Sequence, residues 1–233
     1  MSNGFIKHMT LLPLLIFGIG IIYYHAMRNK MHKKVPKQVN DFSKLLDELL
    51  PLSQLRPLII AIDGRPGSGK TTLAVNLEKA LKAQTIYLDE FFIPQAQWPT
   101  DQTPRFPFFY FRYEEFVNGI KALARAKPFI YYSYNIQTNT LSKEPTTINP
   151  AHVIIVEGVS ALNAELAPLY YKQIWVASDQ ETEFAAIGIR ENEKNLDLWK
   201  KIYLPSVDIY CKQKPWEKAD IIYAGRGINQ KNS

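Results

Sequence analysis

The chain has 233 residues, a 46% hydrophobic fraction and a formal net charge of +6, which suits one folded domain with an appendage. Its single cysteine, Cys211, excludes an internal disulfide, and the lack of C-x-x-C or H-E-x-x-H spacing argues against a zinc site. Residues 1–40 hold six basic and no acidic side chains, which leaves 22 of each in the rest of the chain. A nucleic-acid binder normally carries its basic face on the folded domain, so this distribution argues against that class.

The N-terminal segment has the pattern of a membrane anchor. Residues 9–24 contain no charged side chain, and this length is close to the shortest helix that crosses a bilayer. Tyr23 and Tyr24 lie where an interfacial aromatic belt belongs, and the basic run that follows places the rest of the chain in the cytoplasm. We therefore expect an anchor at 1–27 that contacts the membrane through 9–27, a basic juxtamembrane linker at 28–40 and one domain at 41–233.

Two alternatives to the anchor stay open. A cleaved signal peptide fits poorly, because no small-x-small site follows the apolar run and the basic residues lie on the wrong side of it. Translation that begins at Met27 or Met31 would remove the anchor and leave a cytoplasmic protein.

Alternating segments along the rest of the chain predict an α/β fold. Leucines at helical spacing predict a helix at 41–50, and the apolar run at 58–62 is typical of a buried parallel strand. Further strands are expected at 85–88, 152–156, 172–177 and 220–225, helices at 71–83, 113–126 and most of 179–212, and two β segments within 128–148. This order predicts a five-stranded parallel sheet flanked by helices, with functional residues at the carboxyl ends of the strands.

Residues 64–71, GRPGSGKT, match G-x-x-x-x-G-K-[ST] at every fixed position, between a predicted strand and a predicted helix. In such a loop the backbone N–H groups converge on phosphate oxygens, and the following helix adds its N-terminal dipole. Lys70 is expected to reach the β- and γ-phosphates, and the Thr71 hydroxyl to bind Mg²⁺. The expected phosphate-binding residues are Gly64, Arg65, Pro66, Gly67, Ser68, Gly69, Lys70, Thr71 and Thr72.

Phosphoryl transfer also needs a base for the acceptor hydroxyl and a ligand for the metal. Asp89 and Glu157 end two predicted strands, so both carboxylates are expected to face the phosphates; a helix cap or a solvated loop acid is the alternative for each. Asp89 suits the base, and Glu157 suits a ligand of the metal or of its water. Arg190 is expected to neutralise charge on the transferred group, or else to be an ordinary exposed arginine, and Arg226 is a weaker candidate.

Residues 91–134 contain 14 of the 29 aromatic side chains. Such density predicts a pocket for a flat ring, such as a nucleobase. The alternative is a packed core or a dimer interface, and a dimer interface would make the protein a homo-oligomer. The candidate pocket residues are Phe92, Tyr110, Arg112, Tyr113 and Tyr134.

Several segments, taken in order, resemble the uridine kinase-like branch of the phosphoribulokinase/uridine kinase family of P-loop kinases. They are GRPGSGKTT at the loop, YLDEFF, FFYFRYEEF, VIIVEG, KQIWVASDQETEF, IREN and PWEKADIIYAG, and the similarity runs from about residue 58 to residue 227. The resemblance implies ATP·Mg²⁺ as the phosphate donor, Asp89 as the base, Glu157 near the metal, Arg190 on a lid and a five-stranded parallel sheet.

This sequence departs from the family pattern on the acceptor side. Phe92 stands where the family has tyrosine, and the segment FPFFYFR lacks the aspartate that contacts ribose in uridine kinases. Ala185 and Ala186 stand where further lid arginines are expected, and Glu191 replaces an aspartate. The pattern therefore indicates kinase activity more firmly than it indicates uridine as the phosphate acceptor.

The resulting prediction is ATP-dependent phosphoryl transfer to a hydroxyl of a small molecule, in the manner of uridine and cytidine kinases. The alternative is a membrane-tethered P-loop protein that binds or hydrolyses nucleotide without a small-molecule acceptor. A GTPase would need an N-K-x-D segment, which is absent, and RecA- or ABC-like ATPases usually end the corresponding strand in aspartate rather than in Glu157. A third possibility is a degenerate, non-catalytic relative that binds nucleotide. The intact residues of the site argue against it: Lys70, Thr71, Asp89 and Glu157.

Overall fold

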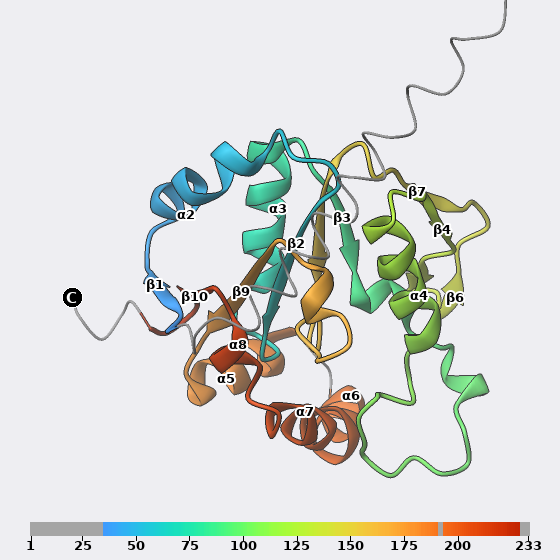
Figure 1. Ribbon diagram of the computed structural model, residues 1–233. Helices are drawn as coiled ribbons and strands as arrows, with labels where there is room; N and C mark the ends of the chain where they lie inside the picture. Colours follow the sequence, from blue (N-terminus) through green and yellow to red (C-terminus); the bar gives the residue numbers. More distant parts are fainter. Residues whose placement is uncertain (1–34, 191–192, 229–233) are drawn as a thin grey trace, which may run out of the picture.

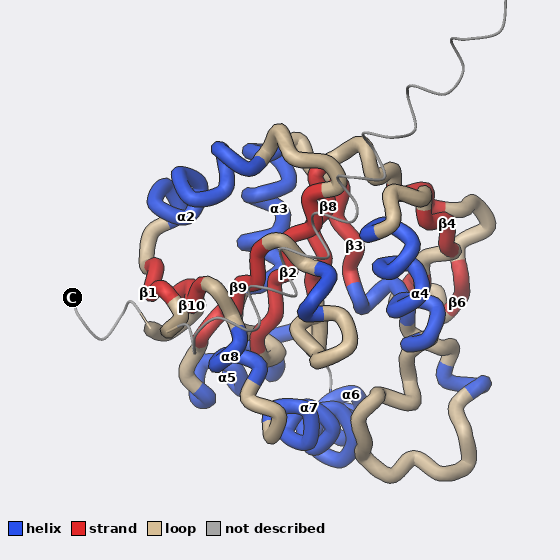
Figure 2. The backbone as a smooth tube through the Cα atoms, in the orientation of Figure 1, coloured by secondary structure: helices blue, strands red, loops and turns tan. Residues whose placement is uncertain are grey.

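A computed structural model describes residues 35–190 and 193–228. A six-stranded sheet lies at its centre, and every neighbouring pair of strands is parallel (Figures 1 and 2). In spatial order its strands are β1 (Lys37–Val39), β10 (Ile221–Ala224), β9 (Lys172–Ala177), β2 (Leu58–Gly64), β8 (Val153–Glu157) and β3 (Gln84–Tyr87). This confirms the predicted α/β fold with a parallel sheet between helices.

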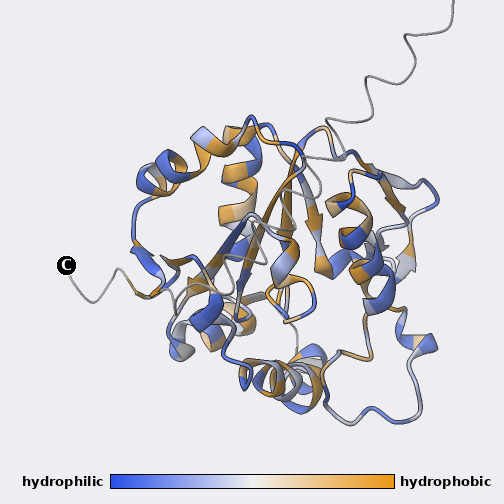
Figure 3. Cartoon of the chain, in the orientation of Figure 1, coloured by the Kyte–Doolittle hydropathy of each residue, from blue (hydrophilic) through white to orange (hydrophobic). Residues whose placement is uncertain are grey.

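Helices cover both faces of the sheet. They are α2 (Phe42–Leu49), α3 (Lys70–Leu81), α4 (Tyr113–Ala124), α5 (Gln180–Arg190), α6 (Glu193–Leu198), α7 (Leu204–Cys211) and α8 (Pro215–Lys218), with a π-helical turn at Trp199–Tyr203. β2 alternates between two hydrophobic clusters: Ile59 and Ala61 pack with residues of α4 and α7, and Leu58, Ile60 and Ile62 pack with residues of α2 and α3. Figure 3 shows hydrophobic residues along the central strands and on the helices that cover them.

A sixth strand, β1, corrects the predicted five-stranded sheet and the predicted linker at 28–40. Lys37–Val39 lie within the expected linker 28–40, yet they pair with β10 at the edge of the sheet. The Lys37 N–H donates to the carbonyl oxygen of Asp220 over 2.9 Å, and Val39 is buried against Leu45 and Leu49 of α2. A strand of three residues carries too few alternating positions to be recognised in the sequence. It forms because it pairs with β10 and packs against α2.

The expected membrane anchor at 1–27 lies outside the described residues. Among the helices of 35–190 and 193–228, none is both long and apolar enough to span a bilayer.

Residues 128–148 form four short strands rather than the two expected segments. β4 (Phe129–Tyr131) pairs antiparallel with β7 (Thr146–Ile148), and β5 (Tyr134–Asn135) pairs with β6 (Thr140–Leu141) inside that hairpin. The Gln84 side chain accepts from the Asn149 N–H over 2.7 Å, which ties this hairpin to the edge strand β3.

Candidate active site

The phosphate loop, residues 64–71, runs from the end of β2 into α3. Gly67 and Gly69 have φ angles of 80° and 102°, in the left-handed region that favours glycine. A Cβ atom on Gly67 would lie 2.9 Å from the carbonyl oxygen of Glu183, so a larger residue there would push α5 off the loop. Because α3 begins at Lys70, the positive end of its dipole faces the space beside the loop.

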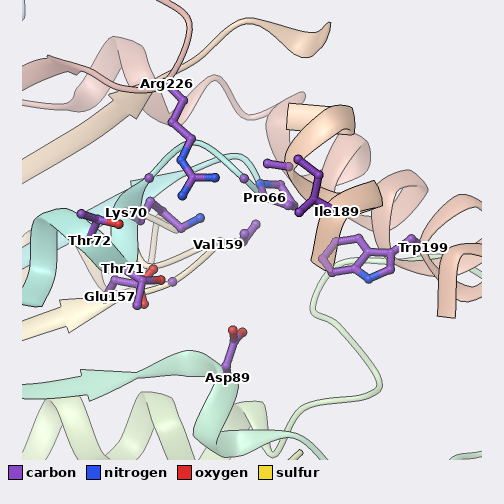
Figure 4. Close-up of a pocket in the computed structure, with 14 residues that line it drawn as sticks. Pro66, Lys70, Thr71, Thr72, Asp89, Glu157, Val159, Ile189, Trp199 and Arg226 are labelled. Atoms are coloured by element: carbon purple, nitrogen blue, oxygen red, sulfur yellow. The ribbon is translucent and has the colours of Figure 1, made fainter. Parts of the chain in front are cut away.

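A cavity of about 320 Å³ lies over this loop (Figure 4). The loop and the start of α3 contribute Pro66, Gly67, Gly69, Lys70, Thr71 and Thr72 to its lining. The ends of β3 and β8 contribute Asp89, Glu157, Gly158 and Val159. The remaining wall comes from Ala186 and Ile189 of α5, Trp199 of the π-helical turn, and Arg226.

Lys70, Thr71 and Glu157 form the inner end of the cavity. Lys70 is buried, and its Nζ donates to the carbonyl oxygen of Arg65 over 3.0 Å. Glu157 is also buried, and its carboxylate lies beside the Thr71 hydroxyl (Figure 4). Burial raises the pKa of Glu157 to about 7, although the Lys70 ammonium acts in the opposite direction. The oxygens of Thr71 and Glu157, which could bind a metal ion, and the Lys70 ammonium therefore lie where the phosphates of a nucleotide would bind.

Asp89 lies across the cavity from this group, and its carboxylate points toward Lys70, Thr71 and Glu157 (Figure 4). It belongs to the short 3₁₀ turn Leu88–Phe91 that follows β3, and its side chain is exposed. The next residue, Glu90, faces away from the cavity and accepts a hydrogen bond from the Tyr131 hydroxyl. Of the two adjacent acids, Asp89 alone lines the cavity.

Sequence comparison assigns the family. The chain is 31% identical over 185 residues to a uridine kinase from Staphylococcus epidermidis, which covers 74% of this chain and 89% of that protein. The chain belongs to the uridine kinase family. It is also 29% identical over 152 residues to a uridine kinase from Leuconostoc citreum, which covers 61% of this chain and 70% of that enzyme. No family model matches the chain.

Structural comparison agrees on the fold. A solved structure described as a possible uridine kinase from Bacillus stearothermophilus superimposes with a TM-score of 0.63 at 19% identity, over 78% of this chain and 96% of that one. The chain is therefore an ATP-dependent small-molecule kinase that phosphorylates a hydroxyl, and the alternative without an acceptor does not hold.

Three predicted phosphate-binding residues of this uridine kinase family member do not line the cavity: Gly64, Arg65 and Ser68. Gly64 ends β2 against β9, where a Cβ atom would lie 2.5 Å from the carbonyl oxygen of Val176. The Arg65 guanidinium bonds to Glu183 and Asp208 instead of facing the cavity. These three positions shape the loop and do not line the cavity. The side chain of Arg65 contacts Glu183 and Asp208 instead.

The aromatic segment packs mainly in the core, as its second interpretation expected. Tyr110 is buried, and Phe92 packs against it with ring centroids 5.7 Å apart. The Arg112 guanidinium donates to the carbonyl oxygen of Glu90 over 2.9 Å. The candidate acceptor-pocket residues Phe92, Tyr110, Arg112, Tyr113 and Tyr134 are all absent from the cavity lining. Their rings and polar groups contact other protein groups, which the residue count of the segment could not distinguish from a pocket.

Tyr113 and Tyr134 each have protein partners as well. The Tyr113 hydroxyl lies 3.3 Å from the Ser160 hydroxyl, and the Tyr134 hydroxyl donates to the Asn139 side chain over 2.8 Å. The side chain of Arg190 lies outside the described residues, so its predicted role on a lid stays a prediction.

Sequence reasoning missed two residues at or beside this uridine kinase-like site, Trp199 and Asp63, and gave little weight to a third, Arg226. Trp199 lines the cavity from the π-helical turn, and such turns occur frequently at functional sites. Asp63 lies just before the phosphate loop, is fully buried and accepts from Gly64 N–H over 2.6 Å. Arg226, the weaker arginine candidate, lines the cavity, and its N–H donates to the Ser68 carbonyl oxygen over 3.0 Å. A charged residue at the end of the apolar run 58–62 was the available signal for Asp63.

Proposed function

We propose that the enzyme transfers the γ-phosphate of ATP·Mg²⁺ to a hydroxyl of a nucleoside, in the manner of uridine and cytidine kinases. The observation that carries the proposal is that Asp89 faces Lys70, Thr71 and Glu157 across one cavity (Figure 4). A base on one side and a phosphate cradle on the other leave room between them for an attacking hydroxyl.

The donor half of the site fits a nucleotide and a magnesium ion. Mg²⁺ prefers oxygen ligands, and the Thr71 hydroxyl and the Glu157 carboxylate both line the cavity at the loop (Figure 4). Thr71 would bind the ion directly, and Glu157 would bind it or one of its waters. When bound there, the ion would neutralise negative charge on the β- and γ-phosphates.

The chain's own residues then account for the transfer. Asp89 would accept the proton of the acceptor hydroxyl as its oxygen forms a bond to the γ-phosphorus, while the bond to the bridging oxygen of ADP breaks. Lys70 would move from the Arg65 carbonyl oxygen to the phosphates and stabilise the charge that develops there. We propose Arg190 for the same electrostatic role on the side of α5.

The acceptor would lie between Asp89 and Trp199. Trp199 packs edge-on against Tyr203, with centroids 5.1 Å apart, and together with Ile189 gives this part of the cavity an apolar wall. A flat ring with a hydroxylated sugar suits an aromatic wall that faces a carboxylate. The named relatives are uridine kinases, which supports a pyrimidine nucleoside as the acceptor class.

An acceptor panel tests this proposal. Purified protein is expected to consume ATP only when a suitable acceptor is present, and uridine or cytidine should give the highest rate among nucleosides, pantothenate, sugars and glycerate. ATP consumption would be followed with and without each compound. Equal rates with and without every acceptor would contradict the proposal.

We also propose that residues 9–27 anchor the enzyme in a membrane, with the kinase domain in the cytoplasm. Because β1 is parallel to the other strands, the chain enters the sheet at the amino ends of the strands. The phosphate loop lies at the opposite, carboxyl ends. The uncharged run 9–24 and the basic residues that follow it support the anchor. Fractionation of the full-length chain against a chain starting at Met31 tests the anchor, and identical soluble behaviour would contradict it.

A further inference from the structure

Arg65 joins the phosphate loop to two helices. Its Nε donates to Glu183 Oε2 of α5 over 2.8 Å, and its Nη1 donates to Asp208 Oδ1 of α7 over 2.9 Å. The same Nη1 lies 3.7 Å from the Cys211 sulfur, also on α7. One side chain of the loop therefore contacts both α5 and α7.

The two ion pairs of Arg65 differ in strength. The Glu183 side chain is 3% exposed, and its other oxygen accepts from the Ser178 hydroxyl over 2.5 Å. The Asp208 side chain is 59% exposed, so water screens its pairing with Arg65. Since an exposed pair contributes little and a buried carboxylate needs its partner, the Glu183 contact is the stronger one.

Two further contacts connect the loop and the strand that precedes it to the same helices. The Tyr210 hydroxyl of α7 donates to Asp63 Oδ2 over 2.6 Å at a buried position. The backbone of Glu183 packs directly on Gly67, where no Cβ atom would fit. The loop, α5 and α7 therefore pack as one unit, and Arg65 supplies its charged contacts.

The backbone of Arg65 also contacts Lys70. Its carbonyl oxygen accepts from Lys70 Nζ, the ammonium that is expected to move to the phosphates when ATP binds. On the other side, α5 carries Ala186 and Ile189 into the cavity, and Trp199 lies in the turn that precedes α7. Arg65 thus lies between the phosphate cradle and the wall that faces the acceptor.

We propose that Arg65 is a positioning residue, which couples ATP binding at the phosphate loop to the placement of α5 and α7 beside the acceptor. This inference rests on the proposed function and adds to it a link between the donor and acceptor halves of the site. Without the guanidinium, α5 would sit loosely on the loop, ATP would bind more weakly, and water would reach the γ-phosphate more often.

The test compares four variants with a matched control. Arg65→Ala removes both contacts, Arg65→Lys keeps a positive charge, and Glu183→Gln and Asp208→Asn each alter one partner. Arg56→Ala is the control, because Arg56 also bridges loops, through the carbonyl oxygens of Ala151 and Ser53 at 2.5 and 2.6 Å, outside the cavity lining. The measurements are ATP affinity at equilibrium, KM and kcat for both substrates, and ATP consumed per acceptor phosphorylated.

Arg65→Ala is expected to weaken ATP binding roughly tenfold, as the loss of a charge-assisted contact would, and to raise ATP consumed per acceptor phosphorylated. Glu183→Gln should act in the same direction, Asp208→Asn should act weakly, and Arg65→Lys should recover part of the loss. Arg56→Ala should leave ATP affinity and the consumption ratio unchanged.

If Arg65→Ala lowers thermal stability but keeps wild-type ATP affinity and a wild-type consumption ratio, the residue is structural only and the inference is wrong. If the wild type phosphorylates no acceptor, the proposed function fails, yet the ATP affinities of the variants still decide the role of Arg65.

Discussion

Asp89 and Glu90 are adjacent in the chain but have opposite surroundings. Asp89 is exposed in the cavity, whereas burial raises the pKa of Glu90, which accepts from Tyr131 on the core side. Rotation of the backbone through the 3₁₀ turn after β3 separates the two carboxylates. The sequence could predict that an acid at this strand end would face the phosphate loop, because strand ends meet at one edge of the sheet. Of the two acids, Asp89 is the one that lines the cavity, and its role as base stays a prediction.

Trp199 offers a residue-scale test of where the acceptor lies. Trp199→Ala is expected to raise KM for the acceptor about tenfold with little change in KM for ATP, because the substitution removes an aromatic wall worth roughly 1–2 kcal/mol. Steady-state kinetics with each substrate varied would measure both constants.

Trp216→Ala is the matched control, since Trp216 packs against Trp175 with centroids 5.5 Å apart and is not in the cavity lining. An unchanged acceptor KM in Trp199→Ala would remove this tryptophan from the acceptor site.

At the scale of elements, β1 is a part of the folded domain that the sequence did not reveal. Val39 is 5% exposed and packs in the cluster beneath α2, whereas Val35, four residues earlier, is 86% exposed. Val39→Ala is expected to lower the free energy of unfolding by about 1–2 kcal/mol through lost burial.

Val35→Ala, the control in the same segment, should change that free energy by less than about 0.5 kcal/mol. Urea unfolding of both variants measures the difference. Equal effects would mean that β1 does not stabilise the domain.

The long, strongly patterned elements could be predicted and the short ones could not. The run 58–62 followed by the loop predicted β2 and α3, because a buried strand, a glycine-rich turn and a helix each leave a distinct local signal. β1 has three residues, and its partner β10 lies about 180 residues away, so its pairing depends on tertiary contacts. The same holds for the Arg65 contacts with Glu183 and Asp208, which join segments far apart in sequence.

The aromatic segment shows the limit of composition. Its density was compatible with a pocket or a core, and only the packing of rings such as Phe91, Phe116 and Tyr131 distinguishes the two. The cavity is lined instead by the aromatic side chain of Trp199, which the helical pattern of 179–212 did not mark.

At the scale of the whole molecule, two buried acids beside the phosphate loop make the free energy of unfolding depend on pH. Burial raises the pKa of Asp63 to about 6 and that of Glu157 to about 7. An acid whose pKa is higher in the folded state binds more protons there than in the unfolded chain, so its contribution to stability falls as pH rises. For Glu157 this contribution is fully present below about pH 4.5, the ordinary glutamate value, and is lost by about pH 7.

In the absence of Mg²⁺, Glu157→Gln is expected to remove this loss. The difference in unfolding free energy between the variant and the wild type should shift in favour of the variant by on the order of 3 kcal/mol between pH 4.5 and 7. Urea unfolding across that range measures it, with Glu165→Gln, at an exposed surface position, as the control for the substitution itself. Parallel profiles for wild type and Glu157→Gln would contradict the assignment.

Asp89 is the proposed base of the phosphoryl transfer, and the function of the whole molecule depends on it. The most direct measurement is transfer of the γ-phosphate of ATP to the best acceptor by wild type, Asp89→Asn and Glu90→Gln, with ATP affinity measured alongside. We predict that Asp89→Asn lowers kcat by roughly 10²-fold or more, the usual contribution of a general base, with ATP affinity nearly unchanged, while Glu90→Gln keeps most of the rate. Near-wild-type transfer by Asp89→Asn would contradict the account.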